Sequence, residues 1–524
     1  MQRGAANERP GEGRGVKRGG RVWHECGTSV RGAFPRVATP LWCAPMNDTI
    51  AAISTPFGEG AIALLRLSGP RAVALAETVF RGTKAVSQMA PRVQHFGAIF
   101  SRERKVDEVL LTVFRGPHSY TGEEVVEIAG HGGVLVSRKI LEVLLEAGAR
   151  SAEPGEFTQR AYLNRKMDLT QAEAVMDLIS AQTDLALRAA TEQLEGRLGE
   201  RIRDLREAVL ALLAHVEAYI DFPDEDIDPD TGEALLAKLD AMRAEIEALL
   251  ATADRGKVLR EGVRTVIYGA PNVGKSSLLN VLLGHERAIV SARPGTTRDV
   301  IEEVINLRGL PLRLVDTAGV RESDDEIEQA GIARTRAQVA RADLVLHVVD
   351  ASAPRAVVDF FADGAEGLER TAEGRGENGH VALSSLRPAA LPASSAAKPS
   401  PGIVHVLNKT DLGEHPSWAG AEAVRVSCLQ GEGIEALVEA IVARVSGGAA
   451  QRDWSLAINA RHADCLRRAE EFGAAAHTAL TDGLSPEFVA EELRGVLDAV
   501  GEIVGKADSE EILGKIFSTF CIGK

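Results

Sequence analysis

A short glycine-containing segment, 269–276, places the strongest constraint on what this chain can fold into. It follows the apolar, strand-like run 265–268 and precedes a run that favours a helix. In such a strand–loop–helix unit, loop N–H groups turn inward around phosphate oxygens, and the helix presents its positive end to them. The segment therefore predicts an α/β sheet with a phosphate-binding loop where a strand ends.

Three later motifs narrow the ligand to a guanine nucleotide. They are 296–297, then 316–319, then 408–411. The last motif identifies the base, because the carboxylate of Asp411 can accept hydrogen bonds from both N1–H and N2–H of guanine, and adenine offers no such pair of donors. An ATP-binding protein is the alternative, and it would be excluded if Asp411→Asn shifted the preference from GTP to xanthosine triphosphate.

Each motif is expected to contact a different part of the nucleotide. Lys275 should bridge the β- and γ-phosphate oxygens, and Ser276 should place its hydroxyl on Mg²⁺. Thr297 is the candidate for a second Mg²⁺ hydroxyl, Asp316 for a contact with Mg²⁺ through water, and the N–H of Gly319 for the γ-phosphate. Asn408 and Asp411 should fix guanine, with a main-chain N–H at 427–428 near its O6. The residues predicted to bind GTP are Asn272, Val273, Gly274, Lys275, Ser276, Ser277, Ser291, Ala292, Arg293, Pro294, Gly295, Thr296, Thr297, Asp316, Thr317, Ala318, Gly319, Asn408, Lys409, Asp411, Ser427 and Cys428.

The 316–319 motif is followed by Val320, where Ras-like enzymes carry a glutamine that orients the attacking water. Hydrolysis must therefore be organised by other groups. The amide oxygen of Asn272, with main-chain carbonyls of 291–296, could hold a monovalent cation. Glu328, in the acidic run 322–328, could orient water, but from the residues alone a solvated helix face explains this run better. The candidate catalytic residues are Glu328, Lys275 and Asn272.

Length, charge and cysteine usage bound the class of protein. A chain of 524 residues exceeds one ordinary core. The formal net charge of −15 argues against a surface that is basic throughout. No apolar run reaches the ~18 residues that a membrane span needs. The five cysteines form no C-x-x-C pair, so we expect a reducing, cytoplasmic setting. The lack of a long apolar run leads us to expect no membrane contact.

Periodicity and composition divide the chain further. Residues 1–46 are basic and lack hydrophobic periodicity, which indicates disorder, as either a misassigned start or a targeting segment. Apolar residues recur every three or four positions from 194 to 216, as in long helices. The expected fold is multidomain, α/β plus α, with an all-α helical domain interrupted by a Ras-like P-loop α/β domain. The predicted domains are the basic extension (1–46), an N-terminal α+β domain (47–166), the first helical part (167–258), the nucleotide domain (259–448) with a low-complexity insertion at about 353–401, and the second helical part (449–524).

Further motifs point to a family. They are 48–52, 120–124, 130–133, 153–157, 221–225, the nucleotide set, and the final Phe-Cys-Ile-Gly-Lys at 520–524. On these motifs the chain resembles the MnmE (TrmE) family of tRNA-modification GTPases over 47–524. The resemblance implies that 47–166 binds a folate and builds a homodimer. The folate, 5-formyl- or 5,10-methylene-tetrahydrofolate, would contact Arg66, Glu127, Lys166 and Lys524.

The resemblance also implies a reaction. GTP hydrolysis would be activated by potassium and coupled, with a flavin-dependent MnmG-type partner in a heterotetramer, to tRNA modification. The product would carry a carboxymethylaminomethyl-type group at C5 of the wobble uridine. Glu328 would support hydrolysis, and Ser276 and Thr297 would bind Mg²⁺. The residues implied to hold K⁺ are Asn272, Ser291, Arg293 and Thr296.

A second function, of a different class, stays open. Ribosome-associated assembly factors also switch with GTP and carry asparagine in the phosphate loop, without folate chemistry. The N-terminal domain and Lys524 discriminate between the two, because an assembly switch needs neither.

Overall fold

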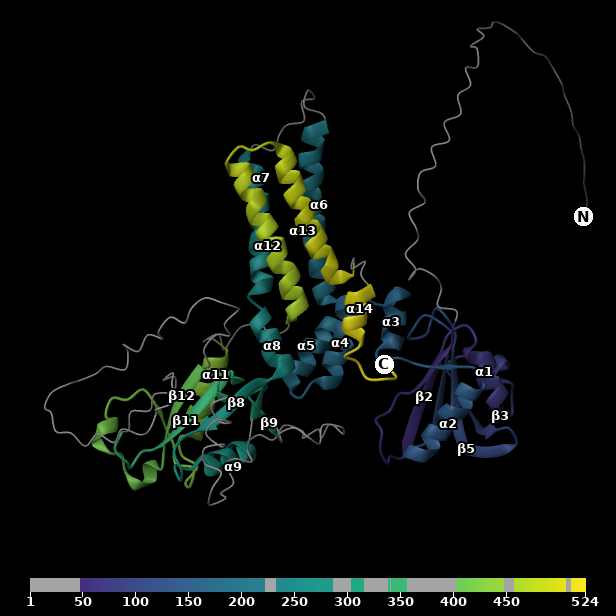
Figure 1. Cartoon of the computed structure of the whole chain (residues 1–524), viewed down its shortest axis with the longest axis horizontal. Coiled ribbons are helices and arrows are strands. Elements are labelled where there is room, and N and C mark those ends of the chain that lie inside the picture. The colour runs from purple at the N-terminus through teal and green to yellow at the C-terminus, as the bar shows by residue number, and fades with distance from the viewer. Residues whose placement is uncertain are drawn as a thin grey trace, which may run out of the picture. The chain divides into compact units, whose positions relative to one another are not determined.

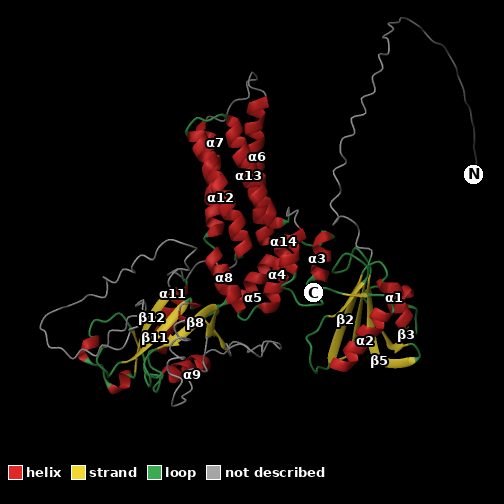
Figure 2. Cartoon of the chain, viewed as in Figure 1, coloured by secondary structure: helices red, strands yellow, loops and turns green. Residues whose placement is uncertain are grey.

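A computed structural model of the chain describes residues 48–221, 232–285, 303–314, 338–339, 341–355, 402–446, 457–505 and 510–524. The predicted basic extension and nearly all of the predicted low-complexity insertion lie outside these residues. Figure 1 follows the course of the chain, and Figure 2 shows its helices and strands. No helix in the described ranges combines the length and the hydropathy that crossing a membrane requires.

The N-terminal part of the chain is a sheet with helices on one face. Its described strands lie in the order β3-β4-β5-β6-β2-β1-β7, and neighbours are antiparallel except for β1 and β7. The amphipathic pattern of 134–147, followed by Gly148, predicts a helix there, and it is confirmed as α2, which ends just before Gly148, whose φ is +109°. The bounds are β1 Ile50–Ile53, β2 Ile62–Ser68, α1 Ala72–Val79, β3 Phe80–Gly82, β4 Gln94–Ser101, β5 Arg104–Phe114, β6 Val125–His131, α2 Val134–Glu146 and β7 Arg150–Ser151.

Buried and partly exposed residues alternate along the strands, so the two faces of this sheet differ. Leu65, Leu111 and Ile128 are fully buried in the core formed with α1 and α2. Their neighbours Arg66 and Glu127 project from the other side and stay partly exposed, because successive strand residues point to opposite faces. Charged side chains therefore sit on an open face backed by a rigid apolar layer.

Helices dominate the next part of the chain and return after the second sheet. The apolar periodicity predicted at 194–216 is confirmed from Leu198 to Val216, whose side chains join a core shared by α6, α7, α12 and α13. Regular hydrophobic spacing explains this packing, since it turns one stripe of each helix inward. Leu194 instead ends α5 and packs against a separate cluster with Leu169 and Phe517. The bounds are α3 Glu156–Leu163, α4 Leu169–Ser180, α5 Asp184–Leu194, α6 Arg197–Asp221, α7 Gly232–Leu250, α8 Ala253–Glu261, α12 Ala460–Thr481, α13 Pro486–Val504 and α14 Glu510–Phe517.

The second sheet contains the strand that leads into the glycine-containing segment. Its described strands lie in the order β13-β12-β11-β8-β10-β9, all parallel except for the β9–β10 pair. Apolar runs predict five strands here, and these are confirmed within a residue or two, but β9 was not predicted. The predicted strands are 265–268, 312–315, 344–349, 403–407 and 424–426. The bounds are β8 Val263–Tyr268, α9 Lys275–His285, β9 Glu303–Leu307, β10 Leu310–Leu314, β11 Leu344–Asp350, β12 Gly402–Asn408, β13 Val424–Arg425 and α11 Ile434–Val445.

Candidate functional site: a phosphate turn and a charged sheet face

The turn between β8 and α9 depends on left-handed backbone. Asn272 has a φ of +63° and Gly274 a φ of +97°. A Cβ on Gly274 would lie 2.1 Å from Nδ2 of Asn408, so glycine is required for space as well as for conformation. Helix α9 begins at the next residue, Lys275. The turn therefore faces the positive end of a helix, which is a favourable place for an anion.

Lys275 folds back over this turn. Its Nζ donates to the carbonyl oxygens of Gly269, at 3.0 Å, and Ala270, at 2.8 Å. Burial lowers the pKa of Lys275, because desolvation disfavours the charged ammonium, whose two hydrogen-bond acceptors here are neutral carbonyls. A phosphate in the turn would supply the missing negative charge, so the residues present fit a phosphate ligand.

The amide of Asn408 joins the turn to two other segments. This side chain, at the end of β12, is only 2% exposed. Its Nδ2 donates to the carbonyl of Val273 at 2.9 Å, and its Oδ1 accepts from the main-chain N–H of Cys428 at 3.2 Å. One buried side chain therefore fixes the phosphate turn against the segment that follows β13.

Two further polar contacts hold the segment 408–411 in place. Oδ1 of Asp411 accepts from Oγ of Ser427 at 2.6 Å, and Nζ of Lys409 lies 2.7 Å from Oδ2 of Asp350. Burial raises the pKa of Asp350, but hydrogen bonds from Lys409 and Ser352 outweigh it and hold the pKa below its usual value. Asp350 was not predicted, although an acidic residue at the carboxyl end of a parallel strand was a usable signal.

Cys428 contributes its backbone rather than its thiol. Burial, together with the nearby charge of Asp411, raises the pKa of its thiol to about 11. The sulfur therefore stays protonated at neutral pH, and the main-chain N–H of Cys428, which was predicted to lie near O6 of guanine, donates here to Oδ1 of Asn408. The other predicted nucleotide and cation residues, 291–297 and 316–319, lie outside the described residues, as does Glu328.

A second group of charged residues lies on the open face of the N-terminal sheet. Nε and Nη2 of Arg66 donate to Oε1 of Glu127, at 3.0 and 2.7 Å. The guanidinium carbon of Arg66 is 5.3 Å from the ring centre of Tyr120 and 5.8 Å from that of Phe157. The two rings limit the motion of the guanidinium. Neither aromatic residue was predicted, because both are distant from Arg66 in sequence.

Lys524 is brought to the same place by the chain segment after α14. The main-chain N–H of Phe157 donates to the carbonyl of Lys524 at 3.2 Å, and Oγ of Ser54 donates to the carbonyl of Gly523 at 3.1 Å. Burial and the charge of Arg66 lower the pKa of Lys524, while Glu127 opposes this shift. Three of the four predicted folate residues are therefore close enough to interact.

The fourth, Lys166, has a different partner. Its Nζ donates to the carbonyl of Pro117 at 2.9 Å, and its side chain is exposed. Pro117 belongs to the loop between β5 and β6, which also carries Tyr120. Lys166 is thus connected to the Arg66 cluster through this loop rather than by direct contact.

A buried ionic network anchors α3 beneath this cluster. Arg160, which is 1% exposed, donates to Asp48 and Glu156 at 2.8 Å and to Glu123 at 3.3 Å. Burial raises the pKa of Glu156, but its bonds with Arg150 and Arg160 prevail and lower it. Because a broken buried ion pair is costly, the network holds Phe157 and the loop at Glu123 in fixed positions.

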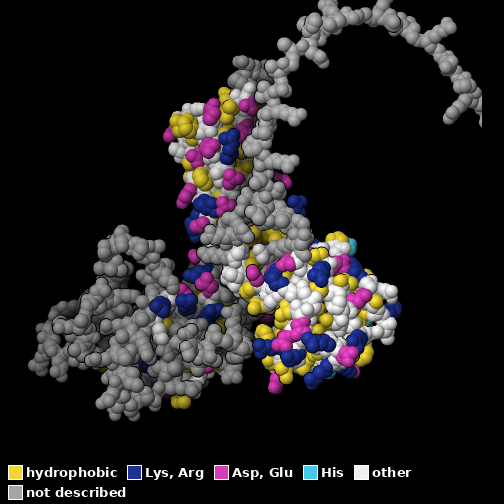
Figure 3. All heavy atoms as spheres, turned by 45° about the vertical axis from the view of Figure 1, so that its right-hand side comes forward, with side chains coloured by type: hydrophobic (Ala, Val, Ile, Leu, Met, Phe, Trp, Pro, Cys, Tyr) yellow, Lys and Arg dark blue, Asp and Glu magenta, His cyan; other side chains and the backbone are white. Residues whose placement is uncertain are grey.

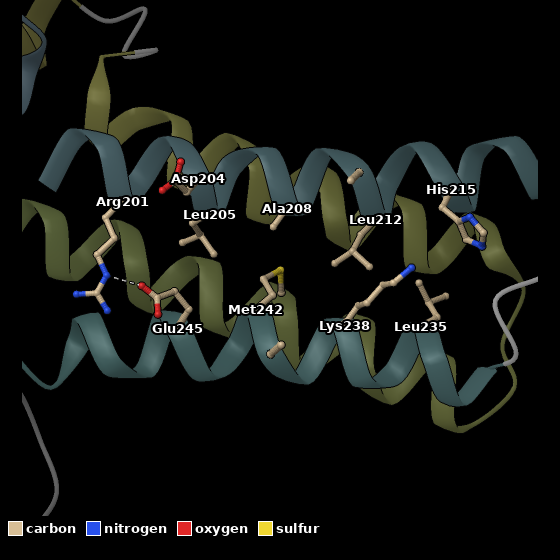
Figure 4. A pocket seen from close by; sticks show the side chains of 12 residues that line it. Arg201, Asp204, Leu205, Ala208, Leu212, His215, Leu235, Lys238, Met242 and Glu245 are labelled. Atoms are coloured by element: carbon tan, nitrogen blue, oxygen red, sulfur yellow. Dashed lines mark hydrogen bonds and ion pairs between the residues drawn. The ribbon is translucent and has the colours of Figure 1, made fainter. Parts of the chain in front are cut away.

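A groove of about 660 Å³ lies elsewhere, between α6 and α7 (Figure 4). Leu205, Leu212 and Met242 form its apolar floor, and an ion pair between Arg201 and Glu245 crosses one end. The groove lies between α6 and α7 because these two helices pack loosely against each other, whereas α6 packs closely against α13 and α7 against α12. We assign no ligand to it.

Comparisons with known proteins decide the family. Residues 49–166 match the family described as GTP-binding protein TrmE N-terminus, and residues 169–521 match the MnmE helical domain. A protein of Akkermansia muciniphila named tRNA modification GTPase MnmE is 48% identical over 91% of this chain and 99% of its own length. The chain belongs to the MnmE family.

Other MnmE proteins agree with this assignment. Those of Clostridioides difficile and Aquifex aeolicus are 42% and 43% identical, each over 91% of this chain and 100% of their own length. Among solved structures, the G domain of the T. maritima FeoB iron transporter covers 36% of this chain and 98% of its own, at 20% identity. Its TM-score of 0.20 is too low to support a conclusion.

Proposed function

We propose that this chain is a GTPase that acts in tRNA modification and binds a tetrahydrofolate on its N-terminal sheet. The observation that carries the proposal is the cluster of Arg66, Glu127 and Lys524, assembled from distant segments in the same chain as the phosphate turn. A switch protein has no need for this second cluster. The printed name of the relatives, tRNA modification GTPase, supports the first half of the proposal.

For the nucleotide, we propose that Lys275 and the turn N–H groups bind the phosphates and that Asn408 and Asp411 orient the base. Ser276, in the first turn of α9, would hold Mg²⁺ together with Thr297. When bound, Mg²⁺ would neutralise charge on the β- and γ-phosphates. The left-handed backbone of Asn272 supports this proposal, because it shapes the turn around its ligand.

Hydrolysis would use K⁺ and Glu328. Asn272 with main-chain groups of Ser291, Arg293 and Thr296 would hold K⁺, which replaces the charge of an arginine finger. GTP turnover should then be much faster in potassium than in sodium, and equal rates would remove the cation from the proposal. Glu328→Ala should lower kcat with little change in GTP affinity, because a water-orienting group acts mainly in the transition state.

For the folate, Oε1 of Glu127 is engaged by Arg66, so its other oxygen is suited to accept from the N–H donors of a pterin. Arg66 and Lys524 would meet carbonyl or anionic groups of the cofactor. The rings of Tyr120 and Phe157 support this assignment, because they pack around Arg66 and add apolar surface for a flat heterocycle. Bound 5-formyl- or 5,10-methylene-tetrahydrofolate would supply the one-carbon unit.

The cellular role that we propose follows the family. In the cytoplasm, a homodimer of this chain would join a flavin-dependent MnmG-type partner as a heterotetramer and modify C5 of wobble uridine in certain tRNAs. Ile62, Phe96 and Leu110, exposed on the open sheet face, support a second copy as its cover. The proposed domains are 47–166, a helical domain from 167–258 and 449–524, and a nucleotide domain, 259–448, inserted into it; the shared core of α6, α7, α12 and α13 supports that insertion.

One pair of experiments tests this function. Equilibrium dialysis would compare 5-formyl-tetrahydrofolate binding by the full chain and by a variant lacking residues 521–524. We expect binding only by the full chain, and no binding by either protein would favour the assembly switch. Nucleoside analysis of tRNA from cells lacking the protein should show unmodified wobble uridine, and unchanged modification would contradict the role in tRNA.

A further inference from the structure

Three basic residues from separate parts of the N-terminal domain meet at the loop 115–118. Nη2 of Arg92 donates to the carbonyl of His118 at 3.2 Å, and Nζ of Lys166 donates to the carbonyl of Pro117 at 2.9 Å. Arg115, in the loop itself, pairs with Glu124 at 2.8 Å. We call Arg92, Arg115 and Lys166 the cation cluster.

The cation cluster carries uncompensated charge. Arg92 and Lys166 are exposed, and the hydrogen bonds above tie each of them to a neutral carbonyl rather than to a carboxylate. A carbonyl fixes the direction of the side chain but leaves its full charge and its other N–H donors to attract an anion. Because Glu124 balances the charge of Arg115, the positive charges of Arg92 and Lys166 remain. Their hydrogen bonds to the loop carbonyls hold both side chains in place.

The cation cluster and the Arg66 pair lie at the same end of the sheet. Strand register sets Arg66 opposite Glu127, Glu127 opposite Thr112, and Thr112 opposite Gln94. These four residues form one row on the open face, and three strand spacings of about 4.8 Å give it a length of about 14 Å. Gln94 begins β4 two residues after Arg92, so the row leads from the Arg66 pair toward the cation cluster.

The loop between β5 and β6 connects the two groups directly. It carries Pro117 and His118, which hold the cation cluster, and Tyr120, whose ring lies against Arg66. Nδ2 of Asn164 fixes the loop by donating to the carbonyl of Thr121 at 2.7 Å. A ligand that begins at Arg66 and Glu127 and extends along the polar row would bring its far end to the cation cluster.

We propose that the cation cluster binds the γ-linked glutamate tail of a polyglutamylated tetrahydrofolate, which makes the polyglutamylated form the preferred ligand. This inference rests on the proposed folate site. The pterin would lie at Glu127, the p-aminobenzoyl group along the row, and the successive tail carboxylates beside Arg92 and Lys166. The extended, flexible, multiply anionic tail matches two exposed cations a short distance apart.

A tail of carboxylates fits the cation cluster better than an RNA backbone does. Two uncompensated cations are few for a surface that must neutralise many phosphates, and Glu124 lies among them. Two exposed ion pairs of ordinary strength contribute together about a tenfold gain in affinity, which is the size of effect expected for choosing between forms of one cofactor.

Calorimetric titration of the full chain tests the proposal. The probes are 5-formyl-tetrahydrofolate with one and with five glutamates, and the readout is the ratio of the two Kd values. We expect the pentaglutamate to bind about tenfold more tightly to the wild-type chain. Arg92→Ser should reduce this ratio about threefold, and Arg92→Ser with Lys166→Ser should bring it close to one.

A matched control separates local contact from overall charge. Arg138→Ser with Lys139→Ser removes the same charge from the exposed side of α2 and should leave the ratio at about ten. Equal affinity of the wild-type chain for both probes would overturn the inference while leaving the folate site intact. A tenfold preference that persists in the Arg92–Lys166 double variant, or a loss of tRNA affinity in that variant with an unchanged ratio, would also overturn it. Failure of both probes to bind would instead contradict the proposed function.

Discussion

Replacing Asn408 with alanine should destabilise the nucleotide domain even in the absence of nucleotide. The exchange removes the bonds to the carbonyl of Val273, at 2.9 Å, and to the N–H of Cys428, at 3.2 Å, from a side chain that is 2% exposed. A buried polar group that loses its partner costs about 1–3 kcal/mol. Two such groups, partly rehydrated in the space left by the amide, give a loss of about 3 kcal/mol. For a domain of roughly 150–250 residues this lowers the unfolding midpoint by roughly 6–12 °C.

Differential scanning calorimetry of the full chain can measure this loss. A multidomain chain unfolds in more than one transition, so the relevant one is identified first as the transition that GDP shifts upward. Asp411→Asn is the control, because its side chain keeps an oxygen acceptor for Ser427, and its midpoint should stay within about 2 °C of wild type. Equal midpoints for Asn408→Ala and wild type without nucleotide would refute the reasoning that this amide stabilises the unliganded site.

Three further predictions concern single positions. Gly274→Ala should abolish the upward shift caused by GDP in the same calorimetric assay, because the new Cβ would lie 2.1 Å from Asn408; a preserved shift would show that the turn can yield. Gly155→Ala would place a Cβ 2.7 Å from the carbonyl of Phe517 at a φ of +70°, so dialysis should show loss of folate binding with GDP affinity unchanged, and intact folate binding would contradict the role of this contact. Burial and the charge of His405 lower the pKa of His347 to about 4 from an unfolded value of about 6.5, so the unfolded chain takes up this proton first as the pH falls. The neutral His347 should therefore contribute to the free energy of unfolding in full above pH 6.5, and this contribution, up to about 3 kcal/mol, should be lost progressively as the pH falls toward 4. His347→Leu should make the free energy of unfolding, measured by urea titration at pH 6.5 and pH 4, depend less on pH.

Local patterns were sufficient to predict the strands β8, β11 and β12 and the turn after β8. Apolar runs that end at glycine or at a polar motif carry this information within a few residues. The antiparallel strand β9 was not predicted, because it forms an edge whose pairing with β10 depends on a turn rather than on a long apolar run. The alternation of buried and partly exposed residues along β9 depends on its pairing with β10.

The site residues divide in a similar way. Asn408 and Asp411 could be predicted because one short motif contains both. The roles of Tyr120 and Phe157 could not, since each depends on contact with a segment that the sequence does not identify as a neighbour. Asp350 was missed although its place at the carboxyl end of a parallel strand was a usable signal. Arg66 and Glu127 were expected from resemblance, and register explains why they meet: they are directly opposite on β2 and β6.

The hydrogen bond between Ser54 and Gly523 joins residues 469 positions apart. A ribosome releases the sheet that bears Arg66 and Glu127 long before it reaches Lys524, and domains generally fold as they emerge. During synthesis the N-terminal domain would therefore fold before the segment with Gly523 and Lys524 can contact it. A translation product stalled before Gly523 would therefore carry a folded sheet but lack Lys524, and under the proposed folate site it would bind no tetrahydrofolate.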